Sequence, residues 1–300
     1  MYNNINDPQA FTHARALQLE GFKLVGCCDQ NPLVAKEFAQ KWSIPIYDCT
    51  VENLLKKVRH IELVSVCVPT EMQCVVIADL VKAKTKIGVV ILEKPVSKDA
   101  SKIRFITSSL KKMGIHAIVN YFRSFDPFYV ALEEWMMVRK NKMISVNARY
   151  YGTMEDNGCH WLERCISMFG NFVSSSNVRT LPIQSSNLFE IEFQESMVLF
   201  EQVNKRCSYS PMILEIQLED ELLRVIDSEE RVEYFIAKND QKFVGYKNLV
   251  QQKLPLKVSA PTHLSFQMTF KKAKEVIRGD YNDWSQLYRA EEIARILEKI

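Results

Sequence analysis

The stretch Ile87-Gly88-Val89-Val90-Ile91-Leu92-Glu93-Lys94-Pro95 decides the fold of this chain. Its apolar first part has the length of one strand, and such a run is typical of a parallel strand buried on both faces. A carboxylate, an ammonium group and a proline follow at the carboxyl end, where ligands bind in open α/β sheets. Pro95 cannot donate to a strand ladder, so it ends the strand and fixes the backbone just after Lys94. A lysine held there can direct its charge at a substrate oxygen, although an ordinary surface Glu-Lys pair is the simpler alternative.

Strands and helices alternate on both sides of this stretch. The residue pattern predicts strands at 22–28, 44–47, 63–68, 87–92 and 116–121, and helices at 31–42, 52–58, 73–84 and 100–112. Strands separated by helices indicate βαβ units and a parallel sheet. Because βαβ crossovers are right-handed, we expect an α/β fold with a doubly wound, Rossmann-type layer.

The pattern changes after Pro127, where strands begin to alternate between apolar and polar residues. Phe189, Ile191 and Phe193 would lie on one face of a strand, with charged and amide side chains on the other. Such alternation is typical of an antiparallel sheet with one buried face and one face exposed to water or covered by a partner. We therefore predict two domains, a Rossmann-type domain over 1–122 and an α+β domain with a mostly antiparallel open sheet over 123–300.

Composition excludes several classes of protein. The chain has 300 residues, of which 47% are hydrophobic and 25% charged, and this is typical of a globular protein. A net charge of +3 without a cluster of Lys and Arg argues against nucleic acid. No apolar run has the length of a membrane helix, and the polar start does not resemble a signal peptide. The eight cysteines form no CxxC pair, so we expect no metal site and a reducing cytoplasm.

Asp29 stands at the end of the first predicted strand. An acid in this place can accept both hydroxyls of an adenosine ribose, which favours NAD over its 2′-phosphorylated form. No arginine follows within 30–34 to hold a phosphate. An aspartate that only stabilises a turn or caps a helix is an equally good interpretation.

Asp156 and His160 begin a predicted helix that runs to about Phe169, with Gly170 as its end. Residues four apart share a helix face, and a carboxylate beside an imidazole orients it and raises its basicity. This arrangement suits the removal of a proton from an alcohol. For an isolated pair, a capping aspartate and a packed histidine are the more frequent explanation. The other histidines, His13 included, have no comparable partner, and we expect them to be structural or exposed.

Four motifs occur in the order and spacing of the Gfo/Idh/MocA oxidoreductases, the glucose-fructose oxidoreductase and inositol dehydrogenase family. They are Val66-Cys67-Val68-Pro69-Thr70, Glu93-Lys94-Pro95, Asn120-Tyr121-Phe122-Arg123-Ser124-Phe125-Asp126-Pro127, and Asp156-x-Gly158-x-His160. Each motif alone is weak, but four in register are much stronger. The chain resembles the family from about Thr12 to the final helix. The third motif looks most like that of members acting on sugars and nucleotide sugars.

The resemblance implies an oxidoreductase that uses NAD, with NADP less favoured, and a sugar, polyol or nucleotide sugar as substrate. Lys94 would hydrogen-bond the reacting oxygen, while His160, oriented by Asp156, would be the general base in oxidation and the acid in reduction. The resemblance also implies a homo-oligomer formed through the open sheet of the second domain. The implied cofactor contacts are Asp29, Pro69, Thr70, Glu93 and Lys94, and the implied substrate contacts are Lys94, Tyr121, Arg123, Asp156 and His160.

Three departures from the family accompany these matches. Family members begin with an apolar strand and a glycine-rich turn that holds the pyrophosphate, whereas this chain contains no GxG sequence. Its start resembles the family's segment just after that turn, so we expect an N-terminally incomplete Rossmann layer. Gln73 stands where many members have histidine, and Glu163 stands where the helix usually carries aspartate.

Two hypotheses explain the incomplete layer. In the first, the chain is a shortened form of an active dehydrogenase. In the second, it is a catalytically impaired relic that binds a sugar or a partner. Loss of a central strand would expose two ladders of backbone groups, which a marginally stable domain tolerates poorly. Retention of Asp29, Lys94, Asp156 and His160 is expected of an enzyme and equally of a recent relic. We favour the enzyme, and a purely structural scaffold is the weakest hypothesis.

Overall fold

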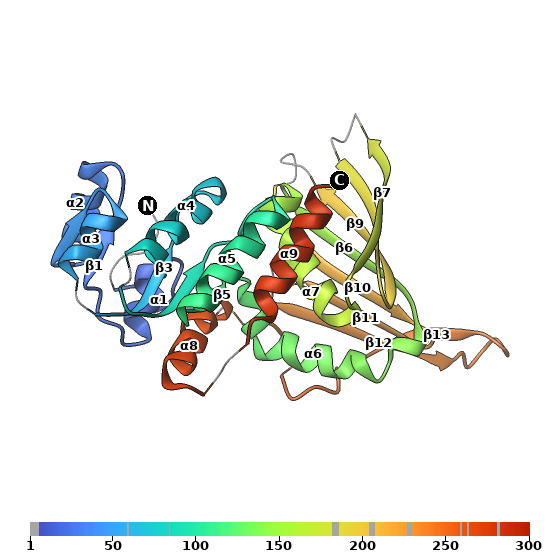
Figure 1. The fold of residues 1–300 in the computed structure, drawn as a ribbon. Coiled ribbons are helices and arrows are strands. Elements are labelled where there is room, and N and C mark those ends of the chain that lie inside the picture. The colour runs from blue at the N-terminus through green and yellow to red at the C-terminus, as the bar shows by residue number, and fades with distance from the viewer. Residues whose placement is uncertain are drawn as a thin grey trace. The chain divides into compact units, whose positions relative to one another are not determined.

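The computed structural model describes residues 6–58, 60–83, 85–181, 186–203, 208–226, 230–258, 260–262, 264–280 and 283–300. The chain folds into two compact units (Figure 1). The first unit contains residues 1–122 and 264–291, and the second contains residues 123–263 and 292–300. The chain therefore leaves the first unit after Phe122 and returns to it at Leu264.

The first unit repeats a strand-helix pattern, as the sequence predicts. Its elements are α1 (His13–Leu19), β1 (Gly26–Cys28), α2 (Pro32–Lys41), β2 (Ile46–Asp48), α3 (Val51–Lys57), β3 (Ile61–Val66), α4 (Thr70–Lys82), β4 (Ile87–Leu92), α5 (Ala100–Met113), β5 (His116–Val119) and α8 (Ser265–Arg278). Helix α9 (Ser285–Leu297) crosses the boundary between the units. All strand pairs of this unit are parallel, which confirms the predicted Rossmann-type fold class.

Short polar side chains begin the helices of this unit. Thr12, Asn31, Thr50 and Asp99 each accept a hydrogen bond from a backbone N–H in the first turn of α1, α2, α3 and α5. Helix α5 ends at Gly114, whose φ of 67° lies in the left-handed region that glycine adopts freely. Local sequence thus sets where these helices start and stop.

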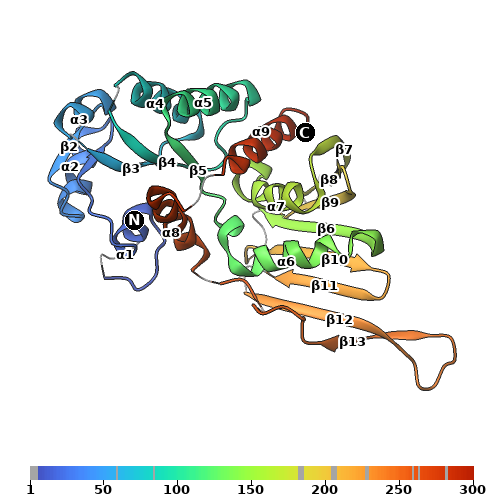
Figure 2. The same cartoon turned by 60° about the horizontal axis from the view of Figure 1, so that its bottom comes forward.

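Strand β4 is the buried centre of the larger parallel sheet. It pairs with β3 on one side, where Val64 lies opposite Val90, and with β5 on the other, where Ile91 lies opposite Ile118. Helices α4 and α5 cover one side of these strands and α8 the other (Figure 2). A side chain at Gly88 would lie 2.8 Å from the carbonyl oxygen of Glu62, so this close strand contact requires glycine.

The parallel sheet of the first unit is in two pieces. Strands β1 and β2 pair only with each other, from Gly26 opposite Ile46 to Cys28 opposite Asp48. Strands β3, β4 and β5 form a separate sheet, and within the described residues no strand joins β1 to β3. Residues 22–25, which we expected to belong to the first strand, lie outside it because β2 pairs only with residues 26–28.

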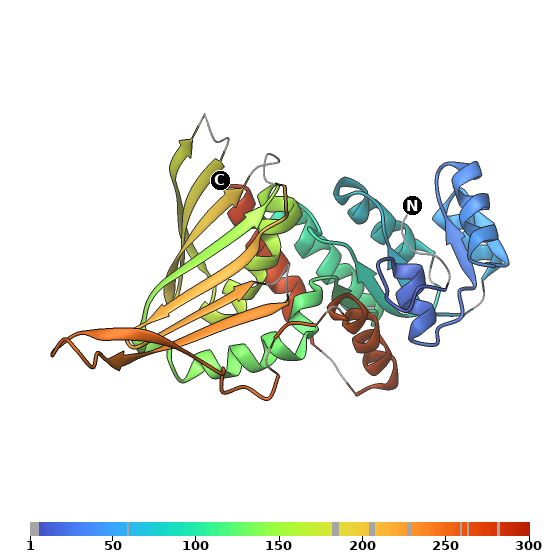
Figure 3. The same cartoon turned by 180° about the vertical axis from the view of Figure 1, so that it is seen from behind.

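The second unit contains one eight-stranded sheet in the order β13-β12-β11-β10-β6-β9-β8-β7. Every pair is antiparallel except β6 with β9, which confirms the predicted, mostly antiparallel sheet. Figure 3 shows this sheet from the opposite side to Figure 1. The elements are α6 (Pro127–Met137), β6 (Met143–Tyr151), α7 (Cys159–Phe169), β7 (Phe172–Leu181), β8 (Ser186–Phe193), β9 (Ser196–Val203), β10 (Met212–Leu218), β11 (Glu221–Ile226), β12 (Arg231–Asn239) and β13 (Lys247–Gln252).

The two faces of this sheet differ in chemistry. The side chains predicted to point inward on β8 are buried, and helix α6 packs Trp135 edge-on against Tyr234 of β12. The opposite face carries cross-strand ion pairs, such as Arg149 with Glu201 at 2.6 Å. This alternation places the core of the unit between the sheet and its helices. Among the described residues no helix is both long and apolar enough to span a bilayer.

Candidate active site

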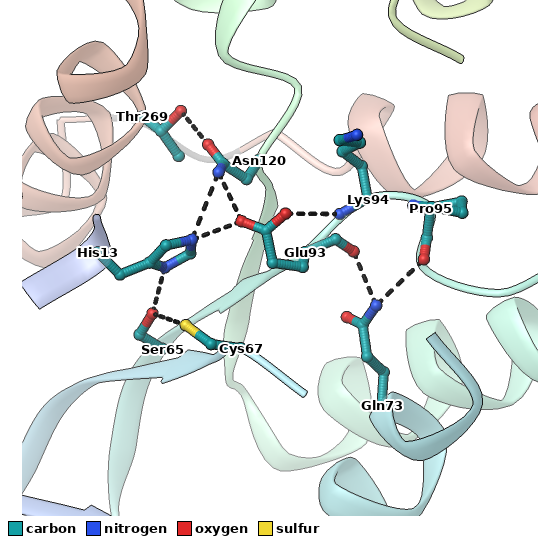
Figure 4. A network of polar contacts seen from close by, with 9 residues as sticks. All are labelled: His13, Ser65, Cys67, Gln73, Glu93, Lys94, Pro95, Asn120 and Thr269. Atoms are coloured by element: carbon teal, nitrogen blue, oxygen red, sulfur yellow. Dashed lines mark hydrogen bonds and ion pairs between the residues drawn. The ribbon is translucent and has the colours of Figure 1, made fainter. Parts of the chain in front are cut away.

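The carboxylate of Glu93 is the centre of a polar network at the carboxyl ends of β4 and β5 (Figure 4). Its Oε1 accepts hydrogen bonds from His13 Nε2 at 2.5 Å and from Asn120 Nδ2 at 2.7 Å. Its Oε2 accepts the backbone N–H of Lys94 at 3.3 Å. Thr269 of α8 donates to Asn120 Oδ1 at 2.9 Å and so fixes the orientation of that amide. Four elements distant in sequence therefore hold one carboxylate beside Lys94.

His13 is a full member of this network, although we expected no comparable partner for it. That expectation is wrong, because the ring lies between Glu93 and Ser65, whose Oγ is 2.5 Å from His13 Nδ1. The edge of the imidazole also packs on Phe266 and Phe270 of α8, with ring centroids 5.6 and 5.0 Å away. These contacts fix the ring at the start of α1.

The environment of His13 stabilises its charged form. Burial of the ring lowers the pKa of His13, but contacts with Cys67 and with the Glu93 carboxylate outweigh that effect and raise the pKa to about 10. Burial likewise raises the pKa of Glu93, and the hydrogen bonds from His13 and Asn120 lower it below its ordinary value. At neutral pH the pair is an imidazolium and a carboxylate. His13 therefore donates through both nitrogens and is no proton acceptor.

Gln73 of α4 holds the backbone on both sides of Lys94. Its Nε2 donates to the carbonyl oxygen of Glu93 at 2.9 Å and to that of Pro95 at 3.1 Å. The Lys94–Pro95 peptide bond is cis. Gln73 is fully buried, so its amide is itself held in place by packing. Both neighbours of Lys94 are thus anchored, and the lysine side chain extends from a backbone with little freedom to move (Figure 4).

Several residues expected to contact the cofactor lie at the carboxyl ends of strands in the first unit. Asp29 directly follows β1, and its Oδ1 accepts the backbone N–H of Asn31 at 2.8 Å. This geometry is that of the turn aspartate considered as the alternative, and it leaves Asp29 half-buried at the strand end. Pro69 is the cap residue of α4 and Thr70 its first helical residue. The side chain of Pro69 accepts no hydrogen bond from the first turn of the helix. The backbone N–H of Met72 donates to the carbonyl oxygen of Pro69 at 2.9 Å, and a helix start without a side-chain cap is compatible with an anion such as a dinucleotide phosphate.

The start of α1 fits such a phosphate less well. Thr12 caps this helix by accepting the backbone N–H of Arg15 at 3.3 Å, and residues 6–12 contain no glycine. A backbone without glycine cannot approach a pyrophosphate as closely as a glycine-rich turn does. Within the described residues, the strand ends and α4 carry the features suited to a dinucleotide, whereas α1 does not.

The second unit carries the Asp156-x-Gly158-x-His160 motif at the junction of two kinds of helix. Residues Met154–Gly158 form a π-helical turn that leads into α7, and α7 ends at Phe169 followed by Gly170, as predicted. Asp156 is exposed on the turn and His160 is buried on the first turn of α7. A π-helical turn inside a helix frequently marks a functional site.

Gly158, at the centre of this motif, lies where there is little room for a side chain. A side chain at Gly158 would lie 2.4 Å from Met154 Sδ and 3.1 Å from the ring of Tyr150. Burial, and after it the charge of Glu155, raise the pKa of the Tyr150 hydroxyl. The glycine thus lets the turn pack directly on β6 and brings the backbone before His160 against the sheet.

Arg123 and Tyr121, both expected to contact substrate, lie on either side of the point where the chain changes unit. Tyr121 is buried at the end of the first unit, and Arg123 is buried at the start of the second. The Arg123 guanidinium lies 5.5 Å from the ring centroid of Trp161, which follows His160 on α7. Within the second unit the structure therefore brings Arg123 close to the Asp156–His160 segment.

Glu163, one of the departures from the family pattern, forms a buried ion pair with its neighbour Arg164. Arg164 donates Nε to Glu163 Oε2 at 2.7 Å and Nη2 to Glu163 Oε1 at 2.9 Å. It also reaches Ser124 Oγ at 3.0 Å, and Glu133 of α6 lies 3.5 Å away. Burial disfavours the charged guanidinium, but the two carboxylates raise the pKa of Arg164 above its usual value. This cluster links α7 to α6.

Residues 5–121 match the family described as "Oxidoreductase family, NAD-binding Rossmann fold", the Gfo/Idh/MocA oxidoreductases. This match covers less than half of the chain. The resemblance predicted from the motifs is confirmed for these residues, and the family that they match binds NAD. In the described residues no group of three potential metal ligands is arranged around a common point.

Solved structures of low sequence identity share the fold of most of this chain. An NAD-binding oxidoreductase from Klebsiella pneumoniae has a TM-score of 0.71 at 13% identity, covering 96% of this chain and 92% of that one. UDP-N-acetylglucosamine 3-dehydrogenase from Acidithiobacillus ferrooxidans has a TM-score of 0.73 at 12% identity, covering 96% and 91%. Levoglucosan dehydrogenase in complex with NADH has a TM-score of 0.70 at 14% identity, covering 96% and 91%. No curated protein matches the sequence.

Sequence reasoning missed three members of the Glu93 network, His13, Gln73 and Thr269. Gln73 was noted only as a departure from the family pattern, and its contacts show a structural use for the change. An amide nitrogen with two hydrogens can serve both carbonyls around Lys94, whereas a histidine nitrogen carries one. Thr269 has no local signal at all, because its partner is 149 positions away in the chain.

Proposed function

We propose that this protein is an NAD-dependent oxidoreductase that moves a hydride between nicotinamide and a hydroxyl or keto carbon of a sugar, polyol or nucleotide sugar. The family match of residues 5–121 supports the cofactor class. Neighbours of the same fold that act on levoglucosan and on UDP-N-acetylglucosamine support the substrate class. The observation that carries the proposal is the anchored backbone of Lys94, held by Gln73 and Glu93 at a strand end.

In this proposal each candidate residue has one chemical task. Lys94 donates a hydrogen bond to the reacting oxygen and stabilises negative charge that develops there. His160 accepts the hydroxyl proton in oxidation and returns it in reduction, and Asp156 orients the imidazole. Tyr121 and Arg123 bind substrate hydroxyl groups. The bound nicotinamide supplies the acceptor or donor of the hydride.

We further propose that Asp29 selects NAD over NADP. Its carboxylate follows β1, and only one of its oxygens accepts a hydrogen bond from the following turn. The other oxygen can accept a ribose hydroxyl, whereas a 2′-phosphate would meet like charge. Asp29→Ala should therefore lower the ratio of NAD to NADP affinity about tenfold or more. An unchanged ratio in parallel titrations would contradict this assignment.

The first experiment is a titration of the 300-residue protein with NADH and NADPH, followed by cofactor fluorescence and calorimetry. A screen of sugars, polyols and nucleotide sugars for cofactor reduction should follow. Lys94→Ala and His160→Ala should each lose turnover by about a thousandfold, and His160→Ala should retain cofactor binding. Lys112→Ala, an exposed lysine of α5, serves as the matched control and should retain full activity.

Failure of a folded sample to bind either dinucleotide would contradict the proposal. Binding of a sugar ligand without any dinucleotide would then favour the alternative, a sugar-binding or partner-binding relative without catalysis. Equal losses in Lys94→Ala and Lys112→Ala would also contradict the role of Lys94, because the loss would then follow charge alone.

A further inference from the structure

The eight-stranded sheet of the second unit has two edges, β7 and β13, and they are built differently. The register of β7 with β8 shifts twice, between Phe172 and Ser174 and between Asn177 and Arg179. Three serines follow one another at 174–176 in the strand. Bulges and polar residues disturb an edge and discourage pairing with another chain. The β7 edge is thus protected against further strands.

The β13 edge has no such protection. Its register with β12 is unbroken from Lys247 to Gln252. The segment 248–252, Asn-Leu-Val-Gln-Gln, contains no charge and no proline. Leu249 and Val250 are 48% and 38% exposed, and no described strand pairs with the outer side of β13. A regular, uncharged and apolar edge of this kind is a template for another strand.

The turn between β12 and β13 exposes further apolar surface. Phe243, Val244 and Tyr246 are 64%, 101% and 70% exposed. The Asp240 carboxylate accepts the backbone N–H of Lys242 at 2.6 Å and that of Phe243 at 2.9 Å, so the turn is held in one conformation. Figure 2 shows this hairpin extending beyond the rest of the sheet. An exposed apolar surface on an ordered turn is typical of a site that contacts another protein.

The hydrogen-bond pattern of the hairpin shows which backbone groups of β13 point outward. The N–H of Asp240 donates to the carbonyl oxygen of Tyr246 at 2.9 Å, so these two residues form a hydrogen-bonded pair. In an antiparallel ladder such pairs alternate with pairs whose polar groups point away from each other. Counting along the register from that pair, the N–H and C=O groups of Lys247, Leu249 and Gln251 face away from β12.

We propose that β13 pairs antiparallel with β13 of a second copy of this chain, around a two-fold axis at Leu249. Leu249 then exchanges backbone hydrogen bonds with Leu249 of the second copy, and Lys247 does so with Gln251 of the second copy. No like charges face each other in this register. The same register brings Phe243 and Val244 of one copy beside residues 254–256, Leu-Pro-Leu, of the other. This adds the apolar area that a contact between two strands alone would lack.

This contact differs from the one implied by the family resemblance. That contact would use the face of the open sheet, whereas this one extends the sheet through its edge. It requires neither cofactor nor substrate, so its failure and that of the proposed reaction are separate outcomes. Both contacts can occur in one assembly, and variants at the edge and at the face distinguish them.

The test is sedimentation equilibrium of the wild-type chain and of Leu249→Pro over a range of protein concentrations. Proline at 249 removes an outward N–H and leaves the hydrogen bonds between β12 and β13 intact, so the fold should survive. The association constant should fall about a hundredfold, because the donor is lost on both copies. Leu249→Ala keeps the N–H and should lose only a few-fold. Gln251→Pro removes a second outward donor and should reproduce the loss.

Met197→Lys is the control for the face of the sheet, because Met197 is 52% exposed on β9 and far from the edge in strand order. Edge pairing predicts that Met197→Lys leaves the β13 amides protected from hydrogen exchange, and that Leu249→Pro exposes them. Three results would overturn the proposal. They are a monomeric wild-type chain at about 100 µM, the same mass for wild type and a folded Leu249→Pro, and β13 amides of the wild type that exchange freely.

Discussion

The strands of the two units are paired into sheets of different extent. In the first unit the parallel strands form two separate sheets, and in the second unit one sheet runs through eight strands. The consequence is visible in burial. Strand β4, paired on both sides, buries nearly all its side chains, whereas β3 is largely apolar in sequence but leaves most of its side chains partly exposed. Among the described strands, β5 pairs on one side only and is nevertheless mostly buried, so neither pairing nor hydrophobicity alone decides how deeply a parallel strand is buried.

Polar networks also take different places in the two units. In the first unit the main network links α1, β4, β5 and α8 around Glu93, at one end of a short sheet. In the second unit the most buried charges, Glu163 and Arg164, link helices α7 and α6. The comparison predicts that the second unit depends on its helix layer and that the first depends on its connections at the strand ends.

The largest expected effect is from Arg164→Met in the second unit. This change leaves Glu163, which is fully buried, without its bidentate partner, and should reduce the free energy of unfolding by about 4 kcal/mol. Urea unfolding followed by circular dichroism measures it. Arg224→Met is the matched control, because that guanidinium is 37% exposed on the sheet face and its loss should cost under about 1 kcal/mol. Equal costs for the two variants would refute the comparison.

His13→Gln should have the next largest effect, and it should depend on pH. The pKa of His13 is raised from 6.5 to about 10, so the contribution of the protonated ring is complete below pH 6.5 and is lost as pH rises through 10. At about pH 6 the variant should be less stable by about 3 kcal/mol, and the difference should vanish above about pH 10. Unfolding curves at several pH values measure this difference. His116→Gln in β5 is the control, and a constant gap between wild type and His13→Gln at every pH would contradict the assignment.

The smallest expected effect concerns two valines that lie opposite each other in the parallel sheet and differ in burial. Val90 of β4 and Val64 of β3 lie opposite each other, and Val90 is fully buried whereas Val64 is only partly so. Val90→Thr buries a hydroxyl group and should cost about 2 kcal/mol, while Val64→Thr should cost under about 1 kcal/mol. Thermal unfolding of both variants compares them. A larger loss in Val64→Thr would show that β3 is better covered than its exposure indicates.

Local patterns were sufficient to predict the elements that carry the candidate site. The apolar run at 87–92 and the residues that end it placed Lys94 at the end of a buried strand, because composition and length alone identify such a run. The end of the helix at Phe169 was equally predictable, since Gly170 stops it, whereas the predicted start at Asp156 lies in the π-helical turn before α7. The alternating residues of β8 likewise predicted which face of the second sheet is buried.

The contacts between segments distant in the chain could not be predicted from the sequence. The bond from His13 to Glu93 joins residues 80 positions apart, and neither residue has a local signal for the other. The π-helical turn before α7 was also missed, because it depends on the fit of Gly158 against Tyr150 and Met154. The separation of β1 and β2 from β3 and the short extent of β1 both depend on strand pairing, and residues 22–25 carry no signal for either.

Strand β6 has a consequence for the order in which the second unit can fold. It lies between β10 and β9 and joins two sets of strands, β7 to β9 and β10 to β13, each of which is connected by successive antiparallel pairs. Each set can form from neighbours in the chain, whereas β6 must find partners about fifty or more residues later. Loop closure over such separations is slow relative to hairpin formation. During synthesis β6 leaves the ribosome before both strands that it pairs with, so it stays unpaired in this sheet until β9 has been made.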